Sequence, residues 1–180
     1  MSTNPINIYA GLWQRVRAFA LDYVIILFYL IAITLFFLLL NSLFHLNNWL
    51  FSDRVSAQFF AFLLVTLPVT IYFAISESST QQATWGKKRL SLQVVGTKGE
   101  RISFFRSFAR TLLKFIPWEL SHTLIWNISF SSEASSTMVN YGFGLVYLLV
   151  GLNIASLIMT KEHQTIYDLI MKTYVVKRVA

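Results

Sequence analysis

Residues 10–40 read AGLWQRVRAFALDYVIILFYLIAITLFFLLL, and the eighteen residues 23–40 contain no charged side chain. A helix needs about 20 apolar residues to cross the hydrocarbon core of a membrane. Asp22 stands directly before this apolar run, and Arg15 lies seven positions earlier on the same face of the predicted helix. Because a charge is expensive at bilayer depth, such residues usually serve a transport path, a pairing network or a switch. Arg15 and Asp22 are therefore the first candidates for a functional site.

The composition of the whole chain indicates a membrane protein. Hydrophobic residues make up 56% of the 180 residues and charged residues only 13%, too few charges for the surface of a soluble domain of this length. Residues 55–76 and 134–160 contain no Asp, Glu, Lys or Arg, and residues 115–132 contain only Glu119. With residues 23–40, these stretches give four candidate spans.

The distribution of basic residues predicts the topology. Eight of the fifteen Lys and Arg fall between Lys87 and Lys114, and most of the others lie before the first candidate span or after the last. Basic residues in short loops stay on the cytoplasmic side. Both termini and the middle segment are thus expected inside, which requires an even number of crossings. We predict a multi-pass protein of the cell inner (cytoplasmic) membrane, with both termini cytoplasmic and residues 115–130 as the third of four spans.

The predicted fold is an all-α, four-span helical bundle in a single domain, residues 1–180, with a cytoplasmic insert between spans two and three. Leu92, Val94 and a turn at 97–100 predict a short β-hairpin whose return arm is 101–103. Basic residues then recur every four positions beside an apolar stripe, which predicts a basic amphipathic helix at the inner membrane surface. These basic residues are Arg106, Arg110 and Lys114.

Three segments together resemble the RDD family of membrane proteins, named for one arginine and two aspartates. They are AGLWQR at 10–15 continuing to Asp22, TWGKKRL at 84–90, and QTIYDL at 164–169, which contains Asp168. The resemblance covers nearly the whole chain. It implies that Arg15, Asp22 and Asp168 are the family's three named residues, and it implies transport of an unspecified ligand, with cation exchange among the proposals.

Asp22 and Asp168 each have two interpretations. Asp22 either pairs with a cation from another element in a structural Arg–Asp network, or binds a cation or proton in transit. Asp168 follows the last span and is expected either to fold back onto Arg15 or the cluster 87–89, or to form a surface salt bridge.

Glu119 and His122 share a face of the predicted third span, since they are spaced i, i+3. A di-iron site would need a second such pair and two further carboxylates, so no metal ion is expected. A proton relay or hydrated polar lining remains open, as does a place near the interface with no special role.

Several classes of function lack support in the sequence. The chain has no cysteine, and no catalytic triad, paired catalytic carboxylates or glycine-rich cofactor loop stands out, so no enzyme and no cofactor is predicted. The position of the basic residues beside the spans favours anionic lipid headgroups over nucleic acid. The residues expected to contact lipid are Lys87, Lys88, Arg89, Arg106, Arg110 and Lys114.

The sequence supports two hypotheses for function. The first is a small transporter of an ion or small ligand, with proton-coupled cation exchange as one form, acting as a homo-oligomer because four spans leave little room for a complete pathway. The alternative is a non-transporting membrane accessory or scaffold protein, whose insert docks lipid or another membrane protein and whose Arg/Asp network is structural.

Overall fold

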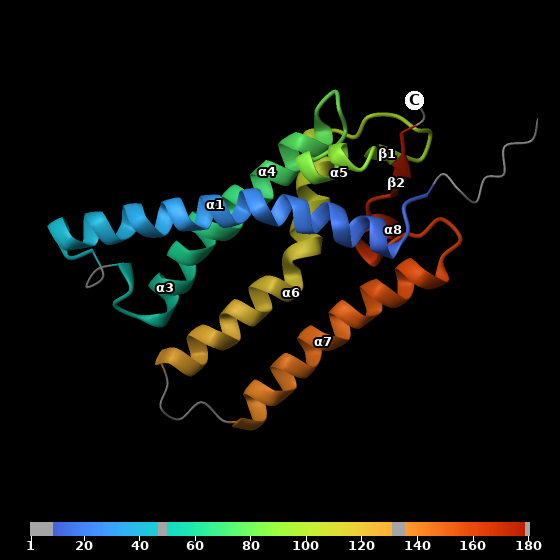
Figure 1. Ribbon diagram of the computed structural model, residues 1–180. Helices are drawn as coiled ribbons and strands as arrows, with labels where there is room; N and C mark the ends of the chain where they lie inside the picture. Colours follow the sequence, from blue (N-terminus) through green and yellow to red (C-terminus); the bar gives the residue numbers. More distant parts are fainter. Residues whose placement is uncertain (1–8, 47–49, 131–135, 179–180) are drawn as a thin grey trace, which may run out of the picture. The chain divides into compact units, whose positions relative to one another are not determined.

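The computed structural model describes residues 9–46, 50–130 and 136–178, and the chain is mostly helical (Figure 1). The long helices are α1 (Leu12–Phe44), α6 (Phe104–Phe130) and α7 (Ser136–Met159). A fourth long helix runs through three consecutive segments, which are α3 (Arg54–Ala61), the π-helical η2 (Phe62–Thr66) and α4 (Leu67–Ser78). The short elements are α5 (Trp85–Arg89), β1 (Leu92–Gly96), α8 (Ile166–Ile170) and β2 (Thr173–Lys177).

Three helices in the described part of the chain are long and apolar enough to cross a membrane. They are Leu12–Phe44, Arg54–Ser78 and Thr137–Met159. The predicted helical membrane fold is confirmed at this level. Helix α6 has 27 residues and continues through Pro117, but it is not one of the three, so the count of four spans stays a prediction.

The π-helical segment η2 ends just before Pro68. Leu67 donates its backbone N–H to the carbonyl of Phe62, five residues back, which is the π-helical spacing. In an α-helix the carbonyl of Leu64 would accept from residue 68, and proline has no N–H to give. The hydroxyl of Tyr29 in α1 donates to that carbonyl instead, at 2.5 Å.

The predicted β-hairpin within the insert is wrong. Strand β1 pairs antiparallel with β2 near the C-terminus, with Val94 opposite Val175. The other edge of β1 is already used, because Val94 donates its N–H to the carbonyl of Gln82 at 2.7 Å. Residues 101–103 are not a strand; Ser103 accepts from the N–H of Arg106 in the first turn of α6, at 3.3 Å.

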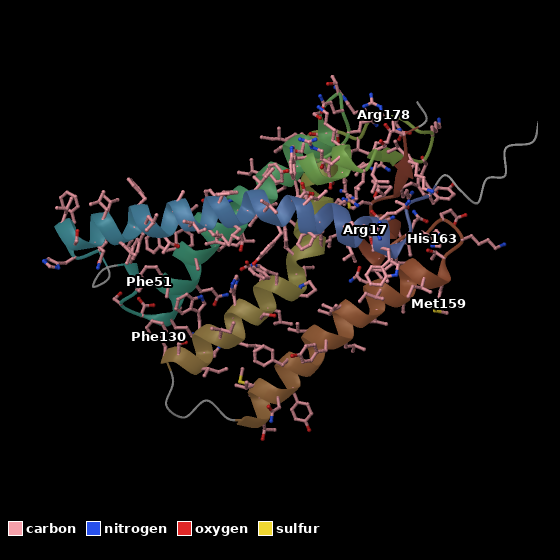
Figure 2. The ribbon with its side chains drawn as sticks, viewed as in Figure 1. Arg17, Phe51, Phe130, Met159, His163 and Arg178 are labelled. Carbon is pink, nitrogen blue, oxygen red and sulfur yellow. The ribbon has the colours of Figure 1, made fainter. Side chains whose placement is uncertain are left out.

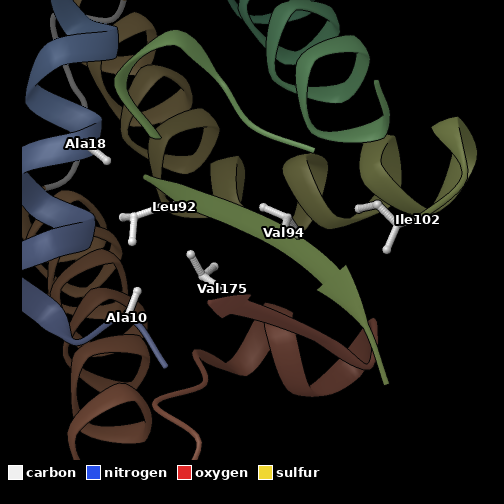
Figure 3. Packing of buried hydrophobic residues seen from close by; sticks show 6 residues of the cluster. All are labelled: Ala10, Ala18, Leu92, Val94, Ile102 and Val175. Carbon is white, nitrogen blue, oxygen red and sulfur yellow. The ribbon is translucent and has the colours of Figure 1, made fainter. Parts of the chain in front are cut away.

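A small apolar core surrounds this sheet (Figure 3). The side chains of Ala10, Leu92 and Val175 point toward one another in the close-up, and each is at most 2% exposed. The backbone N–H of Ala10 donates to the carbonyl of Val175 at 2.8 Å. The start of the chain, the insert and the tail therefore fold together.

The chain divides into two compact units, and the boundaries fall within the long helices. Unit 1 comprises residues 1–24, 70–114 and 150–180, and unit 2 comprises residues 25–69 and 115–149. Every Lys and Arg of the sequence except Arg54 belongs to unit 1. Each of α1, α4, α6 and α7 contributes to both units.

Candidate functional site

Asp168 accepts hydrogen bonds and ion pairs from several described side chains of unit 1. It is fully buried in α8, a helix that Thr165 begins with a capping box. One carboxylate oxygen accepts from Arg15 Nη1 at 2.6 Å and from the Thr165 hydroxyl at 2.8 Å. The other accepts from Arg110 Nε at 2.8 Å and the Thr173 hydroxyl at 3.0 Å. Both oxygens of Asp168 are therefore occupied.

Two further ion pairs extend this contact into a chain of alternating charges. Arg110 Nη1 lies 2.6 Å from a carboxylate oxygen of Glu77, and Lys87 Nζ contacts the other oxygen of Glu77. The exposed fraction of each of these side chains is 10% or less. We call this set the charge chain; in order, it is Arg15, Asp168, Arg110, Glu77 and Lys87.

The charge chain shifts the ionisation of its members. Burial raises the pKa of Asp168, but the attraction of Arg110 and Arg15 outweighs burial and holds that pKa well below its usual range. Burial opposes ionisation of Arg110 as well, yet Asp168 and Glu77 raise its pKa. For Lys87 burial is the larger influence, and its pKa is lowered. Asp168 and Arg110 therefore stabilise each other's charged forms, whereas the balance at Lys87 disfavours its charged form.

Asp22 is bonded quite differently from Asp168. Its carboxylate, only 1% exposed, accepts from the Thr84 hydroxyl at 2.6 Å, the Gly86 N–H at 2.7 Å and the Tyr72 hydroxyl at 3.0 Å. Thr84 is the N-cap of α5, so Asp22 accepts hydrogen bonds from donors in the first turn of that helix. In the described part of the chain no salt bridge joins Asp22 to a cation.

The expected cationic partner of Asp22 is therefore replaced by neutral donors. Arg15 reaches Asp168 instead, and it also donates to the carbonyls of Ala10 at 3.1 Å and His163 at 2.5 Å. The close approach of α5 explains the arrangement around Asp22. Gly86 has no side chain, and a Cβ there would stand 2.0 Å from the carbonyl oxygen of Ala18.

Of the six basic residues expected at lipid headgroups, Lys87 and Arg110 are buried in the charge chain, which corrects the prediction for these two. The ammonium of Lys114 lies 3.8 Å from the ring centroid of Phe73. Arg106 donates to the carbonyls of Met171 and Lys172. Lys88 and Arg89 are exposed. Lipid contact remains a prediction for the residues that are accessible.

Glu77 was not among the predicted site residues, although it bonds to two cations. Its position directly after the apolar stretch 55–76 was a usable signal, because a lone carboxylate at the end of a span needs a partner. Thr84 and Tyr72 were also missed. Neutral donors to a carboxylate leave no signature in the sequence.

Unit 2 contains a line of polar contacts between two helices. The Thr66 hydroxyl donates to the carboxylate of Glu119, and the Gln58 amide donates to the Thr123 hydroxyl at 2.6 Å. Arg54 donates to the side-chain oxygen of Asn127. The α6 members are spaced four residues apart, so they lie on one helix face. We call these residues the polar seam: Arg54, Gln58, Thr66, Glu119, Thr123 and Asn127.

His122 adjoins the polar seam at Glu119. Its Nδ1 lies 3.5 Å from a carboxylate oxygen of Glu119, and the two side chains are 26% and 25% exposed. The ring of Trp118 meets the His122 ring edge-on, with centroids 4.7 Å apart. Glu119 and His122 thus lie close together on one face of α6, the shared face that their spacing predicted, and Thr66 from the facing helix donates a hydrogen bond to Glu119.

An aromatic cluster lies beside the Arg54 end of the polar seam. The Trp126 ring stacks on Phe51 at a centroid distance of 6.1 Å and contacts Phe130 at 5.9 Å; Phe51 and Phe130 are labelled in Figure 2. Rings of this kind are common where a span meets the membrane–water interface.

Comparison with known families settles the relationship of the chain. The family model described as RDD family matches residues 9–172. The chain belongs to the RDD family. This RDD protein is therefore a member of a family of membrane proteins. Neither a search of curated proteins nor a search of solved structures found a match.

The RDD match covers parts of both units and spans the three residues that the resemblance assigned to the family's name. Arg15, Asp22 and Asp168 all lie in unit 1, where Arg15 and Asp168 form an ion pair and Asp22 binds α5. Among the residues described, no group of three or more His, Asp or Glu side chains could hold a metal ion.

Proposed function

We propose that this RDD protein transports a small ion or small ligand across the cytoplasmic membrane, and that the path follows the polar seam. The observation that carries the proposal is the position of Glu119, an ionisable, partly exposed side chain in an apolar helix segment with polar contacts one turn apart on the same face. Ionisable groups in spans most often mark ion or proton pathways.

The proposal includes four spans with both termini in the cytoplasm. Fourteen of the fifteen basic residues, all but Arg54, belong to the unit that also holds residues 9–24 and 150–178, and cytoplasmic loops carry the excess of Lys and Arg. An even number of crossings then makes residues 115–130 of α6 the third span. Its Glu119 and His122 are tolerable at that depth because they contact each other and Thr66.

In this proposal the charge chain is structural. Both oxygens of Asp168 and both oxygens of Glu77 are bonded to cations or hydroxyls within the protein. A transported cation would have to displace an arginine that is itself buried, and that would leave the arginine charge unpaired. At Asp22 three donors of the protein already occupy the carboxylate. The proposed transport site therefore moves from Asp22 and Asp168, the candidates from the sequence, to Glu119.

We also propose that the protein works as a homo-oligomer. About a quarter of the surface of Glu119 and of His122 is exposed, and a carboxylate facing lipid hydrocarbon is costly. A second copy of the chain placed against this face of α6 would cover the pair and complete the path.

A flux assay with the purified protein in proteoliposomes tests the proposal. Uptake of sodium, potassium and protons is measured for the natural protein, Glu119→Gln and Glu162→Gln; the last is a matched control, because Glu162 lies in the turn after α7. We expect a flux that Glu119→Gln reduces and Glu162→Gln leaves unchanged. A folded protein that moves none of these ions, or a Glu119→Gln flux equal to that of the natural protein, rules out this proposal.

The second candidate is a membrane accessory or scaffold protein, and the completeness of the charge chain favours it. Five charges from α1, α4, α5, α6 and α8 form a closed, buried set that resembles a structural clamp. In this role the exposed Lys88 and Arg89 would dock anionic headgroups or an acidic membrane protein. This candidate predicts no flux, together with loss of lipid or partner binding in a Lys88→Gln, Arg89→Gln variant.

A further inference from the structure

We infer that the species bound and released at Glu119 is a proton and not a metal cation. The inference rests on the transport function proposed above and adds the class of substrate. It depends on the number of oxygen ligands near Glu119, the charge along the polar seam, and the contact with His122.

The oxygen atoms around Glu119 are too few and too occupied to coordinate a metal ion. Hard cations such as calcium or magnesium take six or more oxygen ligands. Glu119 is the one carboxylate of the polar seam, and Thr66 already donates to it. The Thr123 hydroxyl accepts from Gln58 at 2.6 Å and donates to the carbonyl of Glu119 at 3.0 Å. The side-chain oxygen of Asn127 accepts from Arg54.

The charges along the polar seam disfavour a metal cation as well. Arg54 places a permanent positive charge on the same helix pair as Glu119, and a protonated His122 would add a second. In α7, which also contributes to unit 2, the segment Ser136–Met159 contains no Asp, Glu, Lys, Arg or His. The positive charge of Arg54, and of His122 when it is protonated, offsets the negative charge of the one carboxylate, so the polar seam gives a further metal cation little net attraction.

A proton needs only a donor and an acceptor within reach, and Glu119 and His122 supply both. With His122 protonated, its N–H bond breaks as an O–H bond forms on the Glu119 carboxylate, which leaves a neutral imidazole and a carboxylic acid. The carboxylic acid then releases the proton to water on the side of the membrane with the lower proton concentration. The neutral His122 takes up another proton from the side with the higher proton concentration. The 3.5 Å separation of Nδ1 and Oε1 needs only a small side-chain rotation to reach hydrogen-bond distance.

The groups that face this pair limit where the proton can go. From the neighbouring helix they are the Thr66 hydroxyl, with Gln58 and Arg54 further along the polar seam. On α6 itself, the ring of Trp118 lies edge-on to the His122 ring. Thr66 contacts Glu119 from the facing helix, and its hydroxyl can both donate and accept a hydrogen bond. It is therefore the natural next member of a relay.

The test measures proton and metal-ion flux separately. Proteoliposomes carry an internal pH dye, the membrane potential is clamped, and the bulk cation is either sodium or the impermeant N-methylglucamine. We expect acidification in both salts, and a decrease of about a hundredfold or more in Glu119→Gln, the order of effect of removing a proton-transferring side chain. His122→Gln should also slow acidification, and Glu162→Gln should not. Glu119→Asp keeps a carboxylate and should retain partial flux, which covers the case in which Glu119→Gln fails to fold.

The outcomes separate this inference from the proposed function. Sodium or potassium uptake that depends on Glu119, without any proton flux in N-methylglucamine, overturns the proton inference and leaves transport intact. No flux of any ion in folded protein overturns both. Infrared difference spectra give a second readout, because a protonated carboxyl group has a C=O band; we expect a pH-dependent band that is absent in Glu119→Gln, and its presence in that variant contradicts the assignment.

Discussion

Arg15 and Asp168 lie 153 positions apart in the sequence, and their charged groups are 2.6 Å apart in the structure. The contact joins the first turns of α1 to α8, which stands between the last long helix and strand β2. The other side of Asp168 contacts Arg110 of α6. Three segments distant in the sequence thus depend on one carboxylate, so folding of unit 1 should be sensitive to it.

Removing either member of this pair should destabilise the protein strongly. Breaking a buried ion pair by deleting one partner leaves an uncompensated charge and costs about 3 to 5 kcal/mol. Arg15→Gln and Asp168→Asn are therefore expected to lower the unfolding midpoint in detergent markedly. Arg17→Gln is the matched control, since Arg17 is exposed two residues away and should behave like the natural protein. Equal midpoints for Arg15→Gln and Arg17→Gln would show that the buried pair contributes nothing.

The pH dependence of stability should report on Asp168. Its pKa in the folded protein lies below the value in the unfolded chain, so in acid the unfolded chain binds the proton first. The stabilisation is therefore fully present above about pH 4, the ordinary carboxyl value, and is lost progressively as the pH falls below it. Unfolding measured between about pH 3 and about pH 7 should show this loss in the natural protein. Asp168→Asn should show a smaller pH dependence over the same range.

Asp22→Asn should be much milder than Asp168→Asn. Asp22 accepts hydrogen bonds from neutral groups, and an asparagine oxygen can replace part of this set while the Thr84 hydroxyl rotates to accept from the amide. The cost is expected to be about 1.5 to 3 kcal/mol, the scale of a hydrogen bond to a charged group. Ion flux per folded molecule should be unchanged. If Asp22→Asn folds fully but has lost its ion flux, Asp22 belongs to the transport site and this prediction is wrong.

Gly86→Ala should loosen the contact between α5 and α1. A Cβ at this position would lie 2.0 Å from the Ala18 carbonyl oxygen, and a backbone atom cannot move aside as a side chain can. Overpacking of this kind costs about 1 to 3 kcal/mol, and it should also lengthen the Gly86–Asp22 hydrogen bond. Gly144→Ala is the control, because a Cβ there meets nothing within 4 Å. Unfolding midpoints of the two variants in detergent give the comparison, and equal midpoints would contradict the tight fit.

The sequence predicted the apolar helices and the importance of Asp22 and Asp168, because runs without charge and isolated charges beside them are local signals. Arg15 was one of the partners expected for Asp168, and the structure pairs the two; the neutral donors to Asp22 and the partners of Glu77 were not predicted. Pairing of β1 with Thr173–Lys177 depends on a contact between the insert and the tail, although the β-branched Val175 and Val176 were a hint of a strand. The sequence did not predict the polar seam, because Gln58 and Thr66 carry no charge. The stretch 55–76 was identified by its lack of ionisable residues, and uncharged polar residues do not change that property.

The contact between Tyr29 and Leu64 leads to a last prediction about the π-helical segment. If the Tyr29 hydroxyl compensates for the missing N–H of Pro68, Tyr29→Phe should cost about 0.6 to 1.7 kcal/mol, the range for hydrogen bonds between membrane helices. In a Pro68→Ala background the helix regains a backbone donor for the Leu64 carbonyl, so the same substitution should cost distinctly less. A double-mutant cycle of unfolding free energies in detergent measures the difference. Equal costs in the two backgrounds would mean that Tyr29 and Pro68 act independently, and that the π-helical turn has another cause.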